Sequence, residues 1–211
     1  GLLRTALSPT YNRWLMKPVR SLAQHLANFA IQTPDAPALI AGGKTWSSRR
    51  LLAEASHRAE QIASTSAPYM LQGSALELAF HAYACSIKNR AFWPVHRNIP
   101  DQGALPAPDT ALIISTSGSE GQPKAVMLSH GNLDAAAIAA NQRLPLGPGD
   151  CWLACLPLYH IGGQSILWRC AEAGATVLLH DGFDAALVAR DFAGRTVTHI
   201  SLVPAMLALL L

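Results

Sequence analysis

The chain is poor in charged residues and has no long apolar segment. Only 14% of its 211 residues are Asp, Glu, Lys or Arg, whereas 50% are hydrophobic. Disordered chains show the opposite balance, so this composition excludes extensive disorder and indicates an α/β protein with a buried core. The net charge of +3 comes from scattered Lys and Arg residues, without the basic patch of a nucleic-acid-binding protein. We therefore expect no nucleic acid among its partners.

Cysteine is also scarce, and the four cysteines form no metal-binding or redox motif. There is no CxxC pair, and the histidines do not complete a zinc-binding spacing. No metal-binding residue is predicted. The cysteines are interpreted as free, buried thiols of a reduced cytoplasmic protein, and they are Cys85, Cys151, Cys155 and Cys170.

Targeting, membrane-spanning and hydrolase signals are absent as well. The N-terminal residues include Arg4 and Arg13 and lack the apolar core of a signal peptide. The apolar stretch 205–211 is far too short to cross a bilayer. No G-x-S-x-G segment presents a serine nucleophile, which argues against a serine hydrolase. We expect a cytoplasmic protein without a membrane span.

The apolar pattern predicts helices that alternate with strands. A glycine pair at 42–43 predicts a hairpin, Ser47 is a candidate cap for the helix that follows, and Asp184 for a later one. Helices are expected at 21–33, 47–62, 74–88, 131–143, 164–173, 184–192 and 205–211. Strands are expected at 38–41, 44–46, 69–71, 91–95, 111–114, 125–128, 151–156, 176–179 and 197–202. This order indicates mostly parallel sheets flanked by helices.

We divide the chain into three parts on this pattern. Residues 1–18 show no periodicity and are expected to form a loose arm. Residues 19–109 form an N-terminal α/β part that ends in a polar, proline-rich connection. Residues 110–211 hold the segments with chemical character.

An apolar run changes abruptly into hydroxyl residues and glycines within the segment 113–124, I-I-S-T-S-G-S-E-G-Q-P-K. Gly118 and Gly121 allow the backbone to approach a ligand closely, so that successive N–H groups converge on an anion. Lys124 adds a positive charge suited to phosphate oxygens. The segment is not a Walker A loop, because Ala125 stands where a Ser or Thr should follow the lysine. It predicts a phosphate-binding loop; a Gly/Ser surface turn is the alternative.

Two later segments follow this loop along the chain. They are P-L-Y-H-I-G-G at 157–163 and T-H-I-S-L-V-P at 198–204. Together the three segments resemble the motifs of the adenylate-forming superfamily, which includes acyl-CoA ligases, luciferases and the adenylation domains of peptide synthetases. Residues 150–169 are similar to the corresponding segment of o-succinylbenzoate–CoA ligases.

The resemblance implies a fold and a reaction. The fold would be the N-terminal part of the large domain of these enzymes. The reaction would be adenylation of a carboxylic acid by ATP with Mg²⁺, followed by thioester formation with coenzyme A. The acid would be o-succinylbenzoate, in menaquinone synthesis, or a fatty or aromatic acid. The residues implied to bind the triphosphate are Ser115, Thr116, Ser117, Gly118, Ser119, Gly121 and Lys124.

His160 is the implied catalytic residue, lining the acyl pocket and taking part in the switch between half-reactions. Gly162, Gly163 and Gln164 would border the same pocket. Each has a structural alternative: a histidine among apolar residues is often a hydrogen-bonded structural group, and two glycines can simply form a turn. Glu120 departs from the family, because many members have Thr there and a carboxylate repels phosphate.

Several family motifs are not found before Leu211. They are a Tyr-Gly-x-Thr-Glu-like segment, an aspartate for the ribose, a hinge, and a small C-terminal domain with the adenylation lysine. We therefore expect a partial N-terminal AMP-binding domain that does not complete the reaction alone. A stand-alone nucleotide- or acyl-adenylate-binding module without catalysis is the competing hypothesis. The sequence does not predict the oligomeric state.

Overall fold

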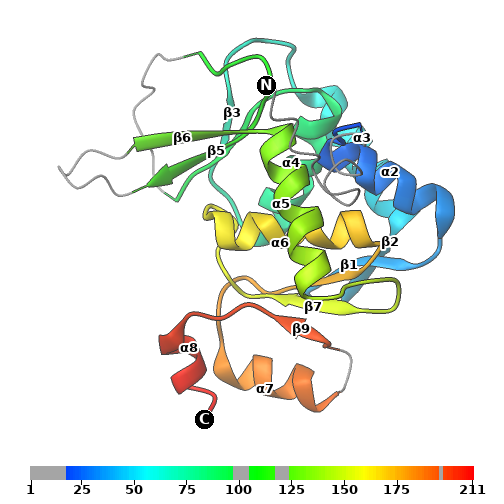
Figure 1. The fold of residues 1–211 in the computed structure, drawn as a ribbon, viewed down its shortest axis with the longest axis vertical. Coiled ribbons are helices and arrows are strands. Elements are labelled where there is room, and N and C mark those ends of the chain that lie inside the picture. The colour runs from blue at the N-terminus through cyan, green and yellow to red at the C-terminus, as the bar shows by residue number, and fades with distance from the viewer. Residues whose placement is uncertain (1–17, 97–104, 117–123, 195–196) are drawn as a thin grey trace, which may run out of the picture.

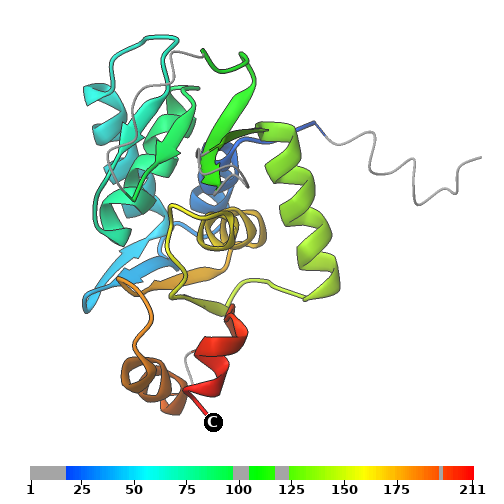
Figure 2. The same cartoon turned by 90° about the vertical axis from the view of Figure 1, so that its left-hand side faces the viewer.

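Two β-sheets enclose a layer of helices in the computed structural model, which describes residues 18–96, 105–116, 124–194 and 197–211 (Figure 1). The predicted arm, 1–18, therefore lies almost entirely outside the described residues. Figure 2 gives the view from the side.

The first sheet has five strands in the order β2–β1–β8–β7–β9. Strands β1 and β2 form the predicted antiparallel hairpin, and every other neighbouring pair is parallel. The strands are β1 (Pro37–Ala41), β2 (Lys44–Ser47), β7 (Cys151–Ala154), β8 (Thr176–Leu179) and β9 (His199–Ile200). Strands β7 and β9 are shorter than predicted.

The second sheet has four strands in the order β3–β4–β5–β6. The pairs β3–β4 and β4–β5 are parallel, whereas β5 and β6 are antiparallel. The strands are β3 (Tyr69–Leu71), β4 (Phe92–Pro94), β5 (Thr110–Thr116) and β6 (Lys124–Ser129). The α/β fold with mostly parallel sheets is thus confirmed, and each sheet combines strands from before and after residue 109.

Two helices begin at the capping residues that the sequence predicts. Ser47 accepts a hydrogen bond from the amide of Arg50, and Asp184 from that of Leu187, as predicted. The helices are α2 (Leu22–Gln32), α3 (Ser48–Gln61), α4 (Ala75–Ile87), α5 (His130–Arg143), α6 (Ile161–Ala173), α7 (Ala185–Ala193) and α8 (Pro204–Ala208). Helix α6 begins three residues earlier than predicted, and α8 ends three residues earlier.

Both sheets share one core through the helix layer. Helices α3 and α6 pack on the five-stranded sheet, α4 and α5 on the four-stranded sheet, and α3 contacts α4 while α5 contacts α6. The core joins Leu39 and Val177 of the first sheet to Phe92 and Leu112 of the second. Since α4 contributes to contacts on both sides, seven of its thirteen residues are buried.

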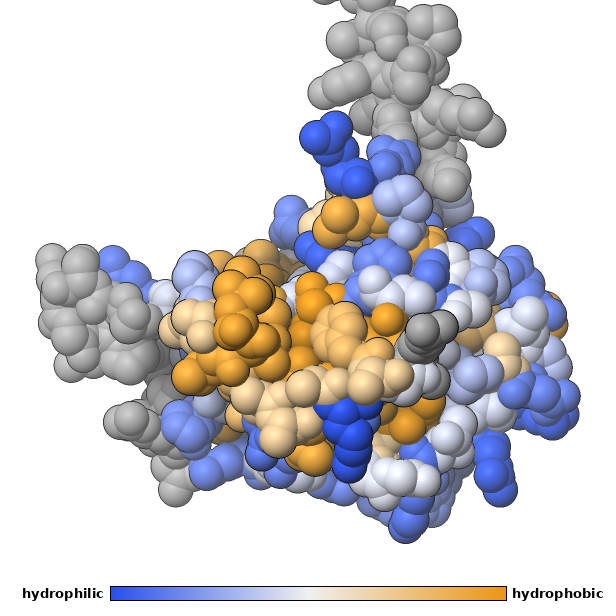
Figure 3. Space-filling model, turned by 90° about the horizontal axis from the view of Figure 1, so that it is seen from below, coloured by the Kyte–Doolittle hydropathy of each residue, from blue (hydrophilic) through white to orange (hydrophobic). Residues whose placement is uncertain are grey.

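Helices α7 and α8 lie on the other face of the five-stranded sheet, below it in Figure 1. Val188 of α7 packs there against Leu153 and Cys155. Figure 3 shows apolar side chains gathered on the lower face of the molecule. The exposed apolar side chains of this region are Leu187, Phe192, Val203, Leu207, Leu209 and Leu211. A contiguous apolar surface of this kind is typical of a face that packs against other protein.

A buried polar pair joins α2 to α5. The ring nitrogen Nε2 of His25 lies 2.7 Å from Oδ1 of Asp134, and Oδ2 of the same carboxylate accepts a hydrogen bond of 3.0 Å from the amide of Arg20. His25 is 3% exposed and Asp134 is 6% exposed. The carboxylate thus satisfies two donors where water has little access.

We expect Asp134→Ala to lower the free energy of unfolding by about 3 kcal/mol, because His25 and the Arg20 amide lose their buried partner. Urea denaturation followed by circular dichroism measures the change. Glu60→Ala is the control, since Glu60 contacts His57 at the exposed surface, and its effect should stay below about 0.5 kcal/mol. Equal effects of the two substitutions would contradict this account.

Candidate functional site

The predicted phosphate-binding segment joins the two strands of the β5–β6 hairpin. Thr116, the last residue of β5, pairs with Lys124, the first residue of β6, and Ser115 pairs with Ala125. The strand pairing therefore holds the hydroxyl residue Thr116 directly beside the lysine, whereas Ser115, one position earlier, points to the opposite face of the sheet. Lys124 is exposed. The predicted loop residues Ser117, Gly118, Ser119 and Gly121 lie outside the described residues, as does Glu120.

The two hydroxyl groups at the end of β5 are held by protein contacts. The indole N–H of Trp93 donates a hydrogen bond of 2.9 Å to Oγ of Ser115, and Trp93 is 4% exposed. Oγ1 of Thr116 donates to the carbonyl oxygen of Lys124 at 3.3 Å. The Ser115 hydroxyl accepts the indole bond and keeps its own proton for another acceptor. Of the two, Ser115 is the better placed to donate to an anion.

His160 lies at the start of α6, just after the turn that follows β7. It occupies the N-cap position, but its side chain makes no capping hydrogen bond and is exposed. Its ring meets Tyr159 edge to face at 4.6 Å between centroids, and Tyr159 stacks on His96 at 4.7 Å. The contacts among these three rings join the segments that follow the carboxyl ends of β4 and β7.

Sequence reasoning missed His96. It lies just beyond strand β4, two residues after Pro94. Since ligands of α/β sheets bind beyond the carboxyl ends of parallel strands, its position was the one available signal.

Gly163 belongs to the first turn of α6 and approaches its own chain closely. A Cβ atom on Gly163 would lie 2.4 Å from the carbonyl oxygen of Pro157 and 2.7 Å from that of Leu156. A Cβ atom on Gly162 would lie 3.1 Å from Cδ1 of Leu156. Both glycines thus let the turn after β7 pack against α6, and they do not form a turn of their own.

Gln164 fixes the same turn from inside the protein. It is 1% exposed, and its Nε2 donates a hydrogen bond of 2.7 Å to the carbonyl oxygen of Leu158. Its Oε1 is buried and has no hydrogen-bond partner among the described residues. Of the four predicted acyl-pocket residues, His160 is the exposed one; contact of the other three with a substrate stays a prediction.

The two parts of the candidate site face the same side of the molecule. The loop end of the β5–β6 hairpin, where Thr116 and Lys124 lie, and the first turn of α6 both point to the left in Figure 1, and Figure 2 shows α6 end-on beneath the hairpin. Lys124 carries a positive charge, and the N-terminus of a helix carries a partial one. This side of the protein therefore favours an anionic ligand.

The cysteines take no part in this site. All four are free and buried, as predicted, and burial raises the pKa of Cys151 to about 11 and that of Cys85 to about 12. Such thiols stay protonated at neutral pH and are poor nucleophiles.

The described residues contain no group of three His, Cys, Asp or Glu side chains that could hold a metal ion. No helix among them is long and apolar enough to span a membrane.

The chain is similar to a known protein family and to named members of it. Residues 77–211 match the family model of the AMP-binding enzyme. The 2-succinylbenzoate–CoA ligase of Bacillus mycoides (strain KBAB4) is 43% identical over 103 residues, which are 49% of this chain and 21% of that protein.

Solved structures of related folds cover more of the chain. O-succinylbenzoate coenzyme A synthetase from Bacillus subtilis in complex with AMP has a TM-score of 0.79 at 24% identity, over 88% of this chain and 63% of that one. The same synthetase with ATP and magnesium ion has a TM-score of 0.75 at 23% identity, over 87% and 64%. The chain thus spans less than two thirds of these relatives.

We expect Gly163→Ala to destabilise the protein by about 1–3 kcal/mol, because the new methyl group overlaps the carbonyl oxygens of Pro157 and Leu156. Urea denaturation gives the change. Gly147→Ala is the matched control: a Cβ atom there meets no atom within 4 Å, so stability should hold or rise slightly. If Gly163→Ala were as well tolerated as the control, the close approach would not constrain the turn.

Proposed function

Because the chain belongs to the AMP-binding enzyme family, we propose that it is the N-terminal part of an ATP-dependent acid–CoA ligase. In this reaction a carboxylate oxygen attacks the α-phosphorus of ATP and pyrophosphate leaves, which gives an acyl-adenylate. The thiol of coenzyme A then attacks the acyl carbon, and AMP leaves as the thioester forms.

One observation carries the proposal: the pairing of Thr116 with Lys124 at the loop end of the hairpin. It places a hydroxyl residue and a lysine side by side at the two ends of the glycine-containing segment. The β- and γ-phosphates would be held there by backbone N–H groups, the Ser115 hydroxyl and the Lys124 ammonium, which offset the charge that develops on pyrophosphate. Positioning and charge stabilisation are the main demands of phosphoryl-site chemistry.

Mg²⁺ would enter with the triphosphate in this proposal. Mg²⁺ is commonly bound through substrate phosphate oxygens, and we place those oxygens as its main ligands here. The donor groups at the hairpin suit the phosphates, since Ser115 and Lys124 supply hydrogen-bond donors. The relative solved with ATP and magnesium ion supports the same pair of ligands.

The acyl group would lie against the rings at the start of α6. We propose His160 as the residue that contacts the acyl end and rearranges between the two half-reactions, because it is exposed and makes no capping bond. Tyr159 contacts the His160 ring edge to face, and His96 stacks on Tyr159. Gly162, Gly163 and Gln164 would shape the pocket by fixing the turn after β7.

The proposed acid is o-succinylbenzoate, which would place the enzyme in menaquinone synthesis in the cytoplasm. The identity of 43% to a 2-succinylbenzoate–CoA ligase over half of the chain supports this choice. Fatty or aromatic acids are the alternative substrates. We further propose that this chain does not complete the reaction alone, since it spans less than two thirds of its solved relatives.

A non-catalytic module that binds a nucleotide or an acyl-adenylate is the second candidate. Glu120 favours it, because a carboxylate within the phosphate-binding segment repels a triphosphate. Acid-dependent exchange of pyrophosphate into ATP separates the two candidates, since a ligase catalyses this exchange and a non-catalytic module does not.

We expect the complete gene product to catalyse this exchange with o-succinylbenzoate, and Lys124→Ala to reduce the rate about a hundredfold by removing a charge that stabilises the leaving pyrophosphate. Lys44→Ala is the matched control: Lys44 also opens an exposed hairpin strand, but in the other sheet, and its loss should leave the rate unchanged. Exchange only with fatty or aromatic acids would exclude the proposed substrate, and no exchange by the folded protein would favour the second candidate.

A further inference from the structure

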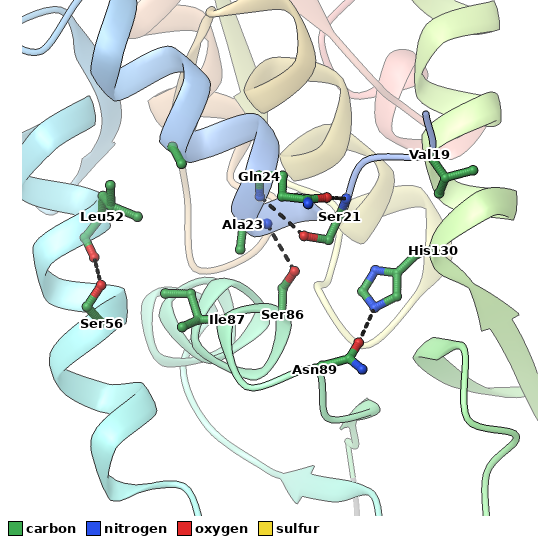
Figure 4. A pocket seen from close by; sticks show the side chains of 11 residues that line it. Val19, Ser21, Ala23, Gln24, Leu52, Ser56, Ser86, Ile87, Asn89 and His130 are labelled. Carbon is green, nitrogen blue, oxygen red and sulfur yellow. Dashed lines mark hydrogen bonds between the residues drawn. The ribbon is translucent and has the colours of Figure 1, made fainter. Parts of the chain in front are cut away.

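A cleft of about 580 Å³ lies at the open end of the β5–β6 hairpin, away from Lys124. The pairing of Thr110 with Ser129 marks this end, and His130 follows directly. Figure 4 shows the cleft between α2, α3, α4 and the start of α5. Its volume falls within the range of small-molecule sites. The lining residues are Val19, Ser21, Ala23, Gln24, Ala27, Leu52, Ser56, Ser86, Ile87, Asn89 and His130.

The lining mixes polar and apolar side chains and carries no charged one. It contains no Asp, Glu, Lys or Arg. Its one titratable side chain is His130, and burial lowers the pKa of that ring, an effect that the nearby Asp109 carboxylate only partly opposes. The ring is thus neutral at physiological pH. A charged ligand would find no opposite charge in this cleft to offset its loss of hydration.

His130 presents an unused acceptor. Its Nε2 lies 3.2 Å from Oδ1 of Asn89. Because a carboxamide oxygen only accepts, Nε2 carries the proton of the neutral ring and Nδ1 carries a lone pair. Nδ1 is buried and has no hydrogen-bond partner among the described residues. A buried acceptor of this kind is costly unless a ligand or water satisfies it.

Donors and an apolar wall complete the lining. Oγ of Ser86 accepts a hydrogen bond of 3.0 Å from the amide of Ala23, which leaves the hydroxyl proton of Ser86 available. The side-chain NH₂ group of Asn89 is a second donor, and φ of +49° holds Asn89 in the left-handed region at the end of α4. Ala27 and Leu52 provide apolar surface beside these groups.

We infer that this cleft binds an uncharged small molecule that carries a primary carboxamide on an apolar body. The carboxamide N–H donates to Nδ1 of His130, and its carbonyl oxygen accepts from Ser86 or Asn89. The apolar body lies against Ala27 and Leu52. A carboxylate offers no donor to Nδ1, and an ammonium offers no acceptor to the two donors. This site is separate from the proposed ATP and acyl sites, and its test needs no ligase activity.

An NMR titration of the ¹⁵N-labelled chain with benzamide tests the inference. Benzoate and benzylamine are the probes of equal size that carry a negative and a positive charge. We expect benzamide to give saturable shifts of the amides in 21–27 and 86–89, and to bind at least about tenfold more tightly than either charged probe. No shifts with benzamide, or equal binding of the three probes, would overturn the inference.

Two variants locate the probe. Ala27→Leu fills the cleft and should abolish the benzamide shifts while the rest of the spectrum is retained. His130→Phe keeps an aromatic ring but removes both Nδ1 and the Nε2 that bonds Asn89, and should weaken benzamide at least about tenfold, because the hydrogen bond to Nδ1 is lost. His57→Phe changes an exposed histidine and is the control. Undiminished binding to Ala27→Leu or to His130→Phe would place the probe elsewhere and refute the site.

Discussion

Burial of both sheets against one helix layer is the constraint on which the rest of the structure depends. The inner face of each sheet must leave water, and one helix layer covers both inner faces, with α3 and α6 on the first sheet and α4 and α5 on the second. Helix α4 therefore carries apolar side chains nearly all round, and α6 has buried side chains along its length. Because the sheets share a core, the hairpin that carries Lys124 and the turn that precedes His160 are held in one orientation.

The described segments of the candidate site have little freedom to move. Strand pairing sets Lys124 beside Thr116, and the buried indole of Trp93 holds Ser115. The turn before His160 is fixed by the close approach of Gly163 and by the bond from Gln164. A phosphate site benefits from such support, because donors that are already in place need no reorganisation when charge develops.

Local chemistry made much of this structure predictable. Capping by Ser47 and Asp184, the glycine hairpin and the apolar strands are set by neighbouring residues, and they were predicted correctly. Non-local packing explains the differences. Two glycines weaken the first turn of α6, yet contact with Leu156 and Pro157 extends the helix through them. The stacking of His96 on Tyr159 joins residues 63 positions apart, which no local pattern reveals.

The central claim is that backbone N–H groups between Thr116 and Lys124 hold the phosphates of ATP. Hydrogen–deuterium exchange of the complete gene product measures those groups directly, with MgATP, with AMP and without ligand. The account predicts slower exchange of the amides in 115–124 with MgATP, a smaller effect with AMP, and no change around His130. Binding of MgATP without protection of 115–124 would contradict it.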